Sequence, residues 1–509
     1  FIKKRLNYNL FPPDIRSVLI SGCWSADELK FPAWFKFGAA SSSYQVEGAW
    51  NVSDKGESIW DHLLHNHPEL VADRSNGDVA CDTYHQWRRD IQMCEELGLD
   101  MYRFSISWSR LIPNGFPNHI SEDGKNYYSN LIDGLLEKGI EPVVTLLHFD
   151  TPQILEDLGG WTNPLIADWF TDYAEVVFSL YADRVKYWIT MNEPLVLCDG
   201  GYDQFLAPYI DDPSIGRYLC NKNIIIAHAK TYRMYEERFK PKYNGKLSLA
   251  NLFFWFEPAT PDDREITDLT IEFWVCEGRY AHPVFSKEGG WPPKLEKFLA
   301  EKAKKEGLPY PILPPFTPEE IKLVRGTYDF YGLNHYTTRI VRMVKPGETP
   351  GAWMLYGSED LGIVMESHPT WKMAAVDWFG VSTVNPEGLR RQLNWLNRTY
   401  DVKEIIITEN GIPTSSGMVD TDRLQYYRDN LEQILFAINE GVNITGYTAW
   451  TLMDNFEWFG GYTGKFGLYA VNFSDPQRTR TARESARYYT SVIRTLNCKF
   501  LWELEISQT

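Results

Sequence analysis

The sequence predicts an α/β fold, a single (β/α)8 (TIM) barrel with elaborated loops at the face formed by the carboxyl ends of its strands. Eight short apolar segments suited to buried strands recur along the 509 residues, and amphipathic helical segments lie between them. No linker or low-complexity tract divides the chain, which favours one compact domain. Alternating strands and helices imply a parallel sheet, and eight repeats in one long domain favour closure into a barrel.

The predicted elements follow one another in barrel order. Each strand candidate is a short apolar run, and each helix candidate carries its apolar residues on one face. The strands are expected at 35–39, 101–108, 142–148, 188–191, 246–252, 330–334, 405–408 and 444–450. The helices are expected at 82–97, 126–138, 166–181, 222–239, 385–400 and 422–440. The proline-rich segment 260–329 is longer than one crossover helix and is interpreted as elaborated loops on one face.

Composition excludes several classes of function. The formal net charge is −17, so a nucleic-acid partner is not expected, because phosphate backbones repel an acidic protein. No apolar run approaches the roughly 20 residues needed to span a bilayer, so no membrane span is expected. The aromatic fraction of 15% suits a large core, and it also suits a sugar site, since flat apolar sugar faces stack on aromatic rings.

Some features point to the secretory pathway. The chain starts at Phe1 rather than Met, as a processed product would, and we expect a secreted protein or one in the lumen of the secretory pathway. None of the seven cysteines has zinc-ligand spacing, and Cys198 and Cys220 could close a disulfide-bonded loop. Candidate glycosylation sites are the sequons at Asn51, Asn397, Asn443 and Asn472.

Two of the predicted strands end in a glutamate that adjoins an asparagine, Asn192-Glu193 and Glu409-Asn410. A carboxylate inside a strand that is buried on both faces is costly, whereas one at the strand end can point into the barrel mouth. Strands four and seven lie nearly opposite each other in an eight-stranded barrel, whose interior is narrow. Glu193 and Glu409 are therefore candidates for the pair of carboxyl groups that glycoside cleavage needs.

Polar and aromatic residues also gather at most of the other strand ends. Arg103, on strand two, could keep one of the glutamates ionised, and Tyr336 could donate a hydrogen bond to the same carboxylate. The alternative for Arg103 is a buried ion pair with a scaffold acid, and for His148 a core histidine. The remaining candidates for sugar binding are Gln45, His148, Asn192, Asn334, Tyr336, Glu457, Trp450 and Trp458.

These strand ends resemble glycoside hydrolase family 1, the β-glucosidase family, in the style of its secreted animal members. The resemblance covers roughly residues 31–495, and the matching motifs are specific when taken together. They include Phe37-Gly-Ala-Ala-Ser-Ser-Ser-Tyr-Gln-Val-Glu-Gly, Thr190-Met-Asn-Glu-Pro, Ile407-Thr-Glu-Asn-Gly and Ala449-Trp-Thr-Leu-Met-Asp-Asn-Phe-Glu-Trp. The expected domains are an amino-terminal extension (1–30), the glycosidase barrel (31–495) and a carboxyl-terminal tail (496–509).

The resemblance implies roles for the site residues. Glu193 is expected to be the general acid/base and Glu409 the nucleophile of a retaining β-glycosidase that forms a covalent glycosyl-enzyme. It would hydrolyse terminal β-D-glucosyl residues, with possible tolerance for galactosyl or fucosyl residues. No metal or cofactor is implied, and the expected partner is a small-molecule β-glycoside, with the protein a monomer or homodimer. Glu457 favours a neutral sugar, since family members acting on 6-phospho sugars lack this glutamate.

Two alternatives remain open. One is a thioglucosidase of the myrosinase type, although plant thioglucosidases replace the acid/base glutamate with glutamine and Glu193 is intact. The other is a non-catalytic binding protein like klotho, although klotho-type relatives lose one glutamate and both are present. The chain departs from the family pattern at His335 and Lys465. Trp378 lies eight residues before Pro386, farther than the family's aglycone-side tryptophan, so Trp378 is only a provisional candidate for aglycone contact.

Overall fold

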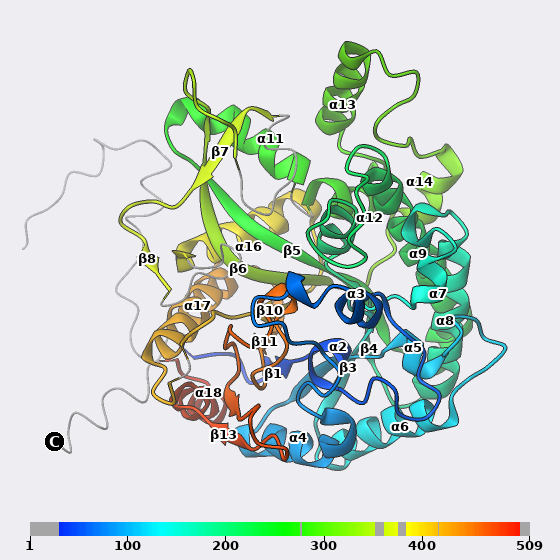
Figure 1. Cartoon of the computed structure of the whole chain (residues 1–509). Coiled ribbons are helices and arrows are strands. Elements are labelled where there is room, and N and C mark those ends of the chain that lie inside the picture. The colour runs from blue at the N-terminus through cyan, green and yellow to red at the C-terminus, as the bar shows by residue number, and fades with distance from the viewer. Residues whose placement is uncertain (1–29, 275–276, 352–360, 375–382, 416, 499–509) are drawn as a thin grey trace, which may run out of the picture.

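Eight parallel strands form a closed ring at the centre of the molecule. The computed structural model describes residues 30–274, 277–351, 361–374, 383–415 and 417–498. Helices surround the ring, so the predicted (β/α)8 barrel is confirmed (Figure 1). The ring strands are β1 (Lys36–Ala40), β2 (Met101–Ser105), β3 (Glu141–Leu147), β4 (Tyr187–Asn192), β5 (Lys246–Pro258), β6 (Tyr331–Met343), β10 (Ile405–Asn410) and β11 (Ile444–Trp450).

The ring closes between β6 and β10. Leu333 of β6 pairs with Ile407 of β10 in parallel register, and β1 pairs on its two sides with β2 and β11. Closure leaves no exposed edge on these strands, so their backbone hydrogen bonds are satisfied within the barrel. All eight strands therefore direct their carboxyl ends to one face, where the polar strand ends of the sequence meet.

The strand sequences are apolar because both faces of the ring are buried. Every residue of β10, Ile-Ile-Ile-Thr-Glu-Asn, is buried. Alternate residues face the helices or the barrel interior. The interior holds a separate apolar cluster drawn from successive strands, which fills the barrel below the face formed by the carboxyl ends of the strands. Its members are Met101, Val143, Ile189, Ala250, Phe330 and Ile406.

The predicted helices exist, with shifts at their starts. They are α4 (Thr83–Leu97), α6 (Glu122–Glu137), α8 (Ile166–Tyr181), α9 (Gly216–Arg238), α16 (Pro386–Tyr400) and α17 (Thr421–Asn439). Helix α6 begins four residues earlier than predicted, because the Ser121 side chain accepts from Gly124 N and caps it. A further helix after β11, α18 (Glu484–Thr495), is absent from the prediction.

The upper part of the molecule in Figure 1 elaborates the carboxyl-end face. Strands β5 and β6 extend to 13 residues each, and β7 (Ile363–Glu366) pairs antiparallel with β6. The prediction that 260–329 forms loops was wrong in part, since much of it is helical. It contains α11 (Arg264–Trp274), α12 (His282–Phe285), α13 (Pro293–Glu306) and α14 (Pro318–Val324). Within the described residues, no helix has both the length and the apolar character to cross a bilayer.

Candidate active site

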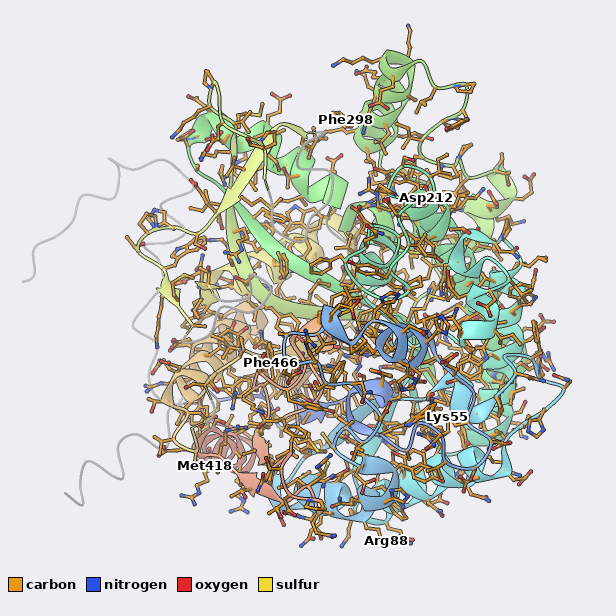
Figure 2. All side chains as sticks on the ribbon, viewed as in Figure 1. Lys55, Arg88, Asp212, Phe298, Met418 and Phe466 are labelled. Atoms are coloured by element: carbon orange, nitrogen blue, oxygen red, sulfur yellow. A yellow bond between two sulfur atoms is a disulfide. The ribbon has the colours of Figure 1, made fainter. Side chains whose placement is uncertain are left out.

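A pocket of about 640 Å³ opens at the carboxyl ends of the strands and brings Glu193 and Glu409 into one cavity. Polar and aromatic side chains line one part of the cavity, and apolar side chains line the rest. The residues that line it are His148, Phe149, Asn192, Glu193, Val196, Phe205, Leu206, Leu252, Phe254, Tyr336, Glu409, Trp450, Glu457, Trp458 and Phe466. Figure 2 labels Phe466 near the centre of the molecule.

Glu193 follows the last residue of β4 and has a backbone φ of +41°, a left-handed conformation that costs energy for a residue other than glycine. Its backbone N–H donates to Ala250 O at 2.8 Å, which ties this turn to β5. Its Oε1 accepts from Asn334 Nδ2 at 2.7 Å, a neutral donor. The side chain is 7% exposed and lines the pocket.

Glu409, near the end of β10, has stronger support for its negative charge. Arg103 Nη1 donates to Glu409 Oε1 at 2.6 Å, and Tyr336 Oη donates to Glu409 Oε2 at 2.6 Å. Arg103 is fully buried and also donates to Asn192 Oδ1 at 2.6 Å. The two contacts expected for one of the glutamates are therefore both made to Glu409, and Arg103 pairs with a pocket acid rather than with a scaffold acid.

The two carboxyl groups differ electrostatically. Burial, followed by repulsion from Glu409, raises the pKa of Glu193 well above its usual range, and Asn334 and Arg103 offset only part of this rise. Burial also raises the pKa of Glu409, but Arg103 and Tyr336 stabilise its carboxylate by charge and by hydrogen bonds. The first proton to leave the pair is therefore that of Glu409, which leaves Glu193 as the proton donor.

Next to this pair, two buried polar atoms lack a hydrogen-bond partner within the described part of the chain, His148 Nδ1 and Glu457 Oε1. Burial, then the charge of Arg103, holds the pKa of His148 well below its usual range, so the ring is neutral. His148 Nε2 lies 3.2 Å from Asn192 Nδ2, which can only donate, so the network assigns the ring proton to Nδ1. Buried polar groups without partners are uncommon, and here they face a pocket where a ligand's hydroxyl groups can satisfy them.

The ring of His148 lies parallel to two tryptophan rings that line the pocket. Its centroid is 5.8 Å from that of Trp450 and 6.1 Å from that of Trp458, with interplanar angles of 12° and 15°. Trp458 is only partly buried, so its ring presents apolar surface to the cavity.

Most of the residues singled out in the sequence line the pocket, and three lie behind it. Arg103 and Asn334 contact the two glutamates without appearing in the lining. Gln45 is fully buried behind the lining, where its Nε2 donates to Phe456 O at 2.9 Å and its Oε1 accepts from Ser42 Oγ at 2.7 Å. Its role in sugar binding stays a prediction. Trp378 lies outside the described residues.

The sequence analysis missed the apolar side of the pocket. Val196, Phe205 and Leu206 come from the segment after Glu193, and Leu252 and Phe254 come from the extension of β5. Strand five was the one strand for which the sequence analysis named no polar candidate, and it contributes apolar wall instead. The run Leu252-Phe-Phe-Trp255, continuing past the predicted strand end, was the available signal.

The chain is similar to known glycoside hydrolases. A model of glycosyl hydrolase family 1 matches residues 27–498. Myrosinase 1 of Brevicoryne brassicae is 43% identical over 472 residues, covering 92% of this chain and 99% of that protein. The human cytosolic β-glucosidase is 40% identical over 475 residues, covering 92% and 98%.

A solved structure extends the comparison to the fold. A mutant of the rice Os3BGlu6 β-glucosidase, in a covalent complex with glucose, superposes with a TM-score of 0.82 at 34% identity. The match covers 92% of this chain and 98% of that one. The chain therefore belongs to glycosyl hydrolase family 1 and is a glycoside hydrolase of the β-glucosidase type.

Proposed function

We propose that the protein hydrolyses terminal β-D-glucosyl residues of neutral O-glycosides with retention of anomeric configuration. The observation that carries this proposal is the unequal pair of buried carboxyl groups in one pocket. Glu409 has a cation and a phenol as partners, whereas Glu193 has a neutral amide. Retaining and inverting glycosidases both need one ionised carboxylate and one protonated carboxylic acid, and retention is the general outcome in glycosyl hydrolase family 1, to which the chain belongs.

In the first step, Glu409 Oε attacks the anomeric carbon while the bond between that carbon and the glycosidic oxygen breaks. Glu193 donates its proton to the leaving oxygen, and the sugar becomes an ester of Glu409. Loss of negative charge from Glu409 then removes the repulsion that raised the pKa of Glu193, which favours ionisation of Glu193. In the second step, the ionised Glu193 takes a proton from water while the oxygen of that water attacks the anomeric carbon. The bond between that carbon and Glu409 breaks, which releases the sugar and restores the Glu409 carboxylate.

The pocket also supports a neutral glycone. Burial raises the pKa of Glu457 to about 8, so at neutral pH this group can donate as well as accept hydrogen bonds. A sugar phosphate would place a dianion beside Glu457 and the Glu193–Glu409 pair, an unfavourable combination of charges. His148 Nδ1–H and Glu457 Oε1 together offer partners for hydroxyl groups.

A second candidate is a thioglucosidase, favoured by the 43% identity with Myrosinase 1 of Brevicoryne brassicae. A glucosinolate carries an anionic sulfate on its aglycone. The residues that line the pocket include no lysine or arginine. By sequence, the internal segments 275–276, 352–360 and 375–382 also lack both residue types. This charge pattern favours an uncharged aglycone over a glucosinolate.

A hydrolysis panel tests both candidates. The panel contains 4-nitrophenyl β-glucoside, β-galactoside and β-fucoside, together with one glucosinolate. We expect the highest kcat/KM for one of the neutral aryl glycosides, and NMR should show that the β-anomer is released first. Release of the α-anomer first would overturn retention, and a higher kcat/KM for the glucosinolate would favour the thioglucosidase. Absence of any turnover would favour a binding protein.

The proposed location is the secretory lumen or the extracellular space. A disulfide joins Cys198 and Cys220, a pairing that the sequence left open, and such bonds persist in oxidising compartments. The sequon residues Asn51, Asn443 and Asn472 are exposed, and Asn397 is half-buried. A drop in mass after treatment of the secreted protein with an N-glycosidase would support glycosylation, and an unchanged mass would exclude it.

A further inference from the structure

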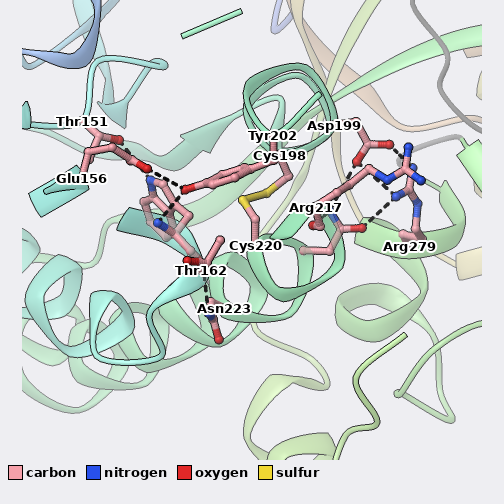
Figure 3. Close-up of a disulfide and its surroundings, with 12 residues drawn as sticks. Thr151, Glu156, Thr162, Cys198, Asp199, Tyr202, Arg217, Cys220, Asn223 and Arg279 are labelled. Atoms are coloured by element: carbon pink, nitrogen blue, oxygen red, sulfur yellow. Dashed lines mark hydrogen bonds and ion pairs between the residues drawn. A yellow bond between two sulfur atoms is a disulfide. The ribbon is translucent and has the colours of Figure 1, made fainter. Parts of the chain in front are cut away.

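The segment that follows Glu193 is tied to the start of helix α9 by the disulfide between Cys198 and Cys220 (Figure 3). Cys198 lies in the short π-helical turn η5 (Val196–Gly200), and Cys220 lies in the second turn of α9. The bond closes a loop with a sequence separation of 22 residues, and that loop contains Phe205 and Leu206 of the apolar pocket wall. A covalent tie therefore restricts the segment that carries this wall.

A buried ion pair reinforces the tie from a third part of the chain. Asp199 accepts from Arg279 at both carboxylate oxygens, 3.1 Å from Nη1 to Oδ1 and 2.6 Å from Nη2 to Oδ2. Arg279 belongs to η7 (Glu277–Ala281), in the insertion between β5 and β6. Asn221 Oδ1 accepts from the same Nη1 at 2.8 Å, so one guanidinium joins η5 to α9 (Figure 3).

Solvent is excluded from this cluster. Arg279 is 1% exposed, Asp199 is 3% exposed and Asn221 is fully buried. The two charges are therefore weakly screened, and the bidentate geometry fixes the relative orientation of the segments that carry them. Loss of Arg279 would leave Asp199 buried without its bidentate partner, a cost that protonation of the carboxylate or a shift of the segment toward solvent would relieve.

Backbone hydrogen bonds connect this cluster to the pocket wall. The carbonyl oxygen of Gly200, next to Asp199, accepts from Phe205 N at 2.9 Å and from Leu206 N at 3.0 Å. Asp199 and Gly200 also line a small cavity together with Phe205, Leu206 and Phe254, and the last three residues line the main pocket as well. A displacement of Asp199 would therefore move Gly200, and through its carbonyl oxygen the backbone of Phe205 and Leu206 in the apolar wall.

We propose that Asp199 and Arg279 are positioning residues that set aglycone selectivity by holding the wall formed by Phe205 and Leu206. This inference rests on the proposed function, because it concerns the leaving-group side of the same pocket. Neither residue makes a hydrogen bond to Glu193 or Glu409 among the described contacts. Glu193 has its own anchors in Ala250 and Asn334. Changes in the ion pair should therefore alter aglycone binding more than bond cleavage.

The test compares a bulky and a minimal leaving group. Arg279→Met is assayed with 4-methylumbelliferyl β-glucoside, whose aglycone reaches the wall, and with β-glucosyl fluoride, whose leaving group is one atom. We expect kcat/KM for the aryl glucoside to fall at least 10-fold, mainly through KM, and kcat/KM for the fluoride to change less than 2-fold. Arg279→Lys should restore part of the loss by returning the charge.

The control for general destabilisation is Arg480→Met. Arg480 Nε lies 3.0 Å from Asp90 Oδ1 in an equally buried ion pair, whose residues do not line the pocket. This variant should leave the ratio of the two kcat/KM values unchanged. If Arg279→Met does not fold, Arg279→Lys, which keeps the charge but not the bidentate geometry, should lower the same ratio by a smaller factor.

The outcomes separate this inference from the proposed function. Equal losses for both substrates in Arg279→Met, or an unchanged ratio in Arg279→Lys where the methionine variant does not fold, would overturn the positioning role. Failure of the wild-type protein to hydrolyse β-glucosyl fluoride would instead overturn the proposed function. A fall in kcat/KM for the aryl glucoside but not for the fluoride in Arg279→Met, with part of the loss restored in Arg279→Lys, supports the inference.

Discussion

Arg103 Nη1 lies 2.6 Å from Glu409 Oε1, and both side chains are shielded from solvent. The corresponding donor to Glu193 Oε1 is the uncharged amide of Asn334, at 2.7 Å. A cation on one side and an amide on the other give two chemically identical side chains different proton affinities. This asymmetry supports the proposed roles, attack by Glu409 and proton donation by Glu193.

Replacement of the proposed nucleophile gives the first prediction. Glu409→Gln should lower kcat for 4-nitrophenyl β-glucoside by about 10⁴-fold or more, because a neutral amide cannot form the glycosyl ester. The amide oxygen can still accept from Arg103, and the amide nitrogen can donate to Tyr336 Oη once that hydroxyl turns, so the fold should persist. Steady-state kinetics and the circular dichroism spectrum check both expectations.

A matched control for this variant lies on the same strand. Glu404, just before the first residue of β10, is at the opposite end of the barrel and pairs with Lys246. Glu404→Gln makes the same chemical change away from the pocket and should keep kcat within about threefold of wild type, since Glu404 does not line the cavity where the reaction takes place. Comparable activity of the Glu404 and Glu409 variants would disprove the assignment of the nucleophile.

The sequence predicts the barrel well because its buried parallel strands are short apolar runs, such as Ile405–Asn410, that are distinct from the surrounding helices. It predicts boundaries less well where tertiary contacts decide them. The 13 residues of β5 continue past the predicted end at Leu252 because β6 offers a pairing partner as far as Val341. Long-range pairing of this kind has no local signal.

The polar part of the site could be predicted for a related reason. Glu193, Glu409 and His148 are conspicuous at the ends of apolar strands, where a polar side chain needs an explanation. Phe205 and Leu206 resemble ordinary core residues in sequence, and only the cross-linked loop after Glu193 brings them to the cavity. The apolar wall therefore required the three-dimensional structure.

Removal of the proposed acid/base gives the second prediction. Glu193→Ala should slow hydrolysis most for substrates with poor leaving groups, since those need protonation in the first step. With 4-nitrophenyl β-glucoside, added azide should restore turnover and yield β-glucosyl azide, because the small anion can attack the glycosyl ester without a general base. Product analysis by NMR checks this, and formation of the α-azide, or no effect of azide, would contradict the assigned role.

The hydrogen bond from Tyr336 to Glu409 gives the third prediction, on pH dependence. Burial raises the pKa of Tyr336 well above its usual range, so the phenol stays protonated and donates to the ionised carboxylate. Tyr336→Phe removes this hydrogen bond, which lowers the pKa of Glu409, so the pKa of Glu409 should rise in the variant. Activity requires ionised Glu409, so the acidic limb of the kcat/KM profile should move to higher pH, with kcat about 10–100-fold lower at its optimum.

Tyr447→Phe is the control for the loss of a buried phenol. Tyr447 Oη donates to Asn410 Oδ1 at 2.8 Å, and Tyr447 does not line the pocket. This variant should lose stability by about 1 kcal/mol without moving either limb of the pH profile. An unshifted acidic limb in Tyr336→Phe would show that Tyr336 does not tune Glu409.

Glu457 gives the fourth prediction, on stability. Burial, together with the charge of Glu409, raises the pKa of Glu457 to about 8, whereas a glutamate in the unfolded chain titrates near 4.3. Below the unfolded pKa both states hold the proton, and between the two values only the folded state does. Rising pH therefore favours unfolding across this window, with a slope of about 1.4 kcal/mol per pH unit.

Glu457→Gln removes that titration and should flatten the dependence of Tm on pH between pH 5 and pH 8. At pH 7 the variant should be more stable than wild type by about 1–3 kcal/mol, because the wild-type protein must keep an unfavourable proton that the amide does not need. The same change should reduce kcat/KM, since Glu457 Oε1 is a buried acceptor in the pocket that a sugar hydroxyl can satisfy. Thermal unfolding at pH 5, 6, 7 and 8 measures the difference, and parallel Tm curves for the two proteins would show that the Glu457 carboxyl group does not titrate in this window. A gain in stability combined with a loss of activity would mean that the buried carboxyl group is kept for sugar binding at a cost to the fold.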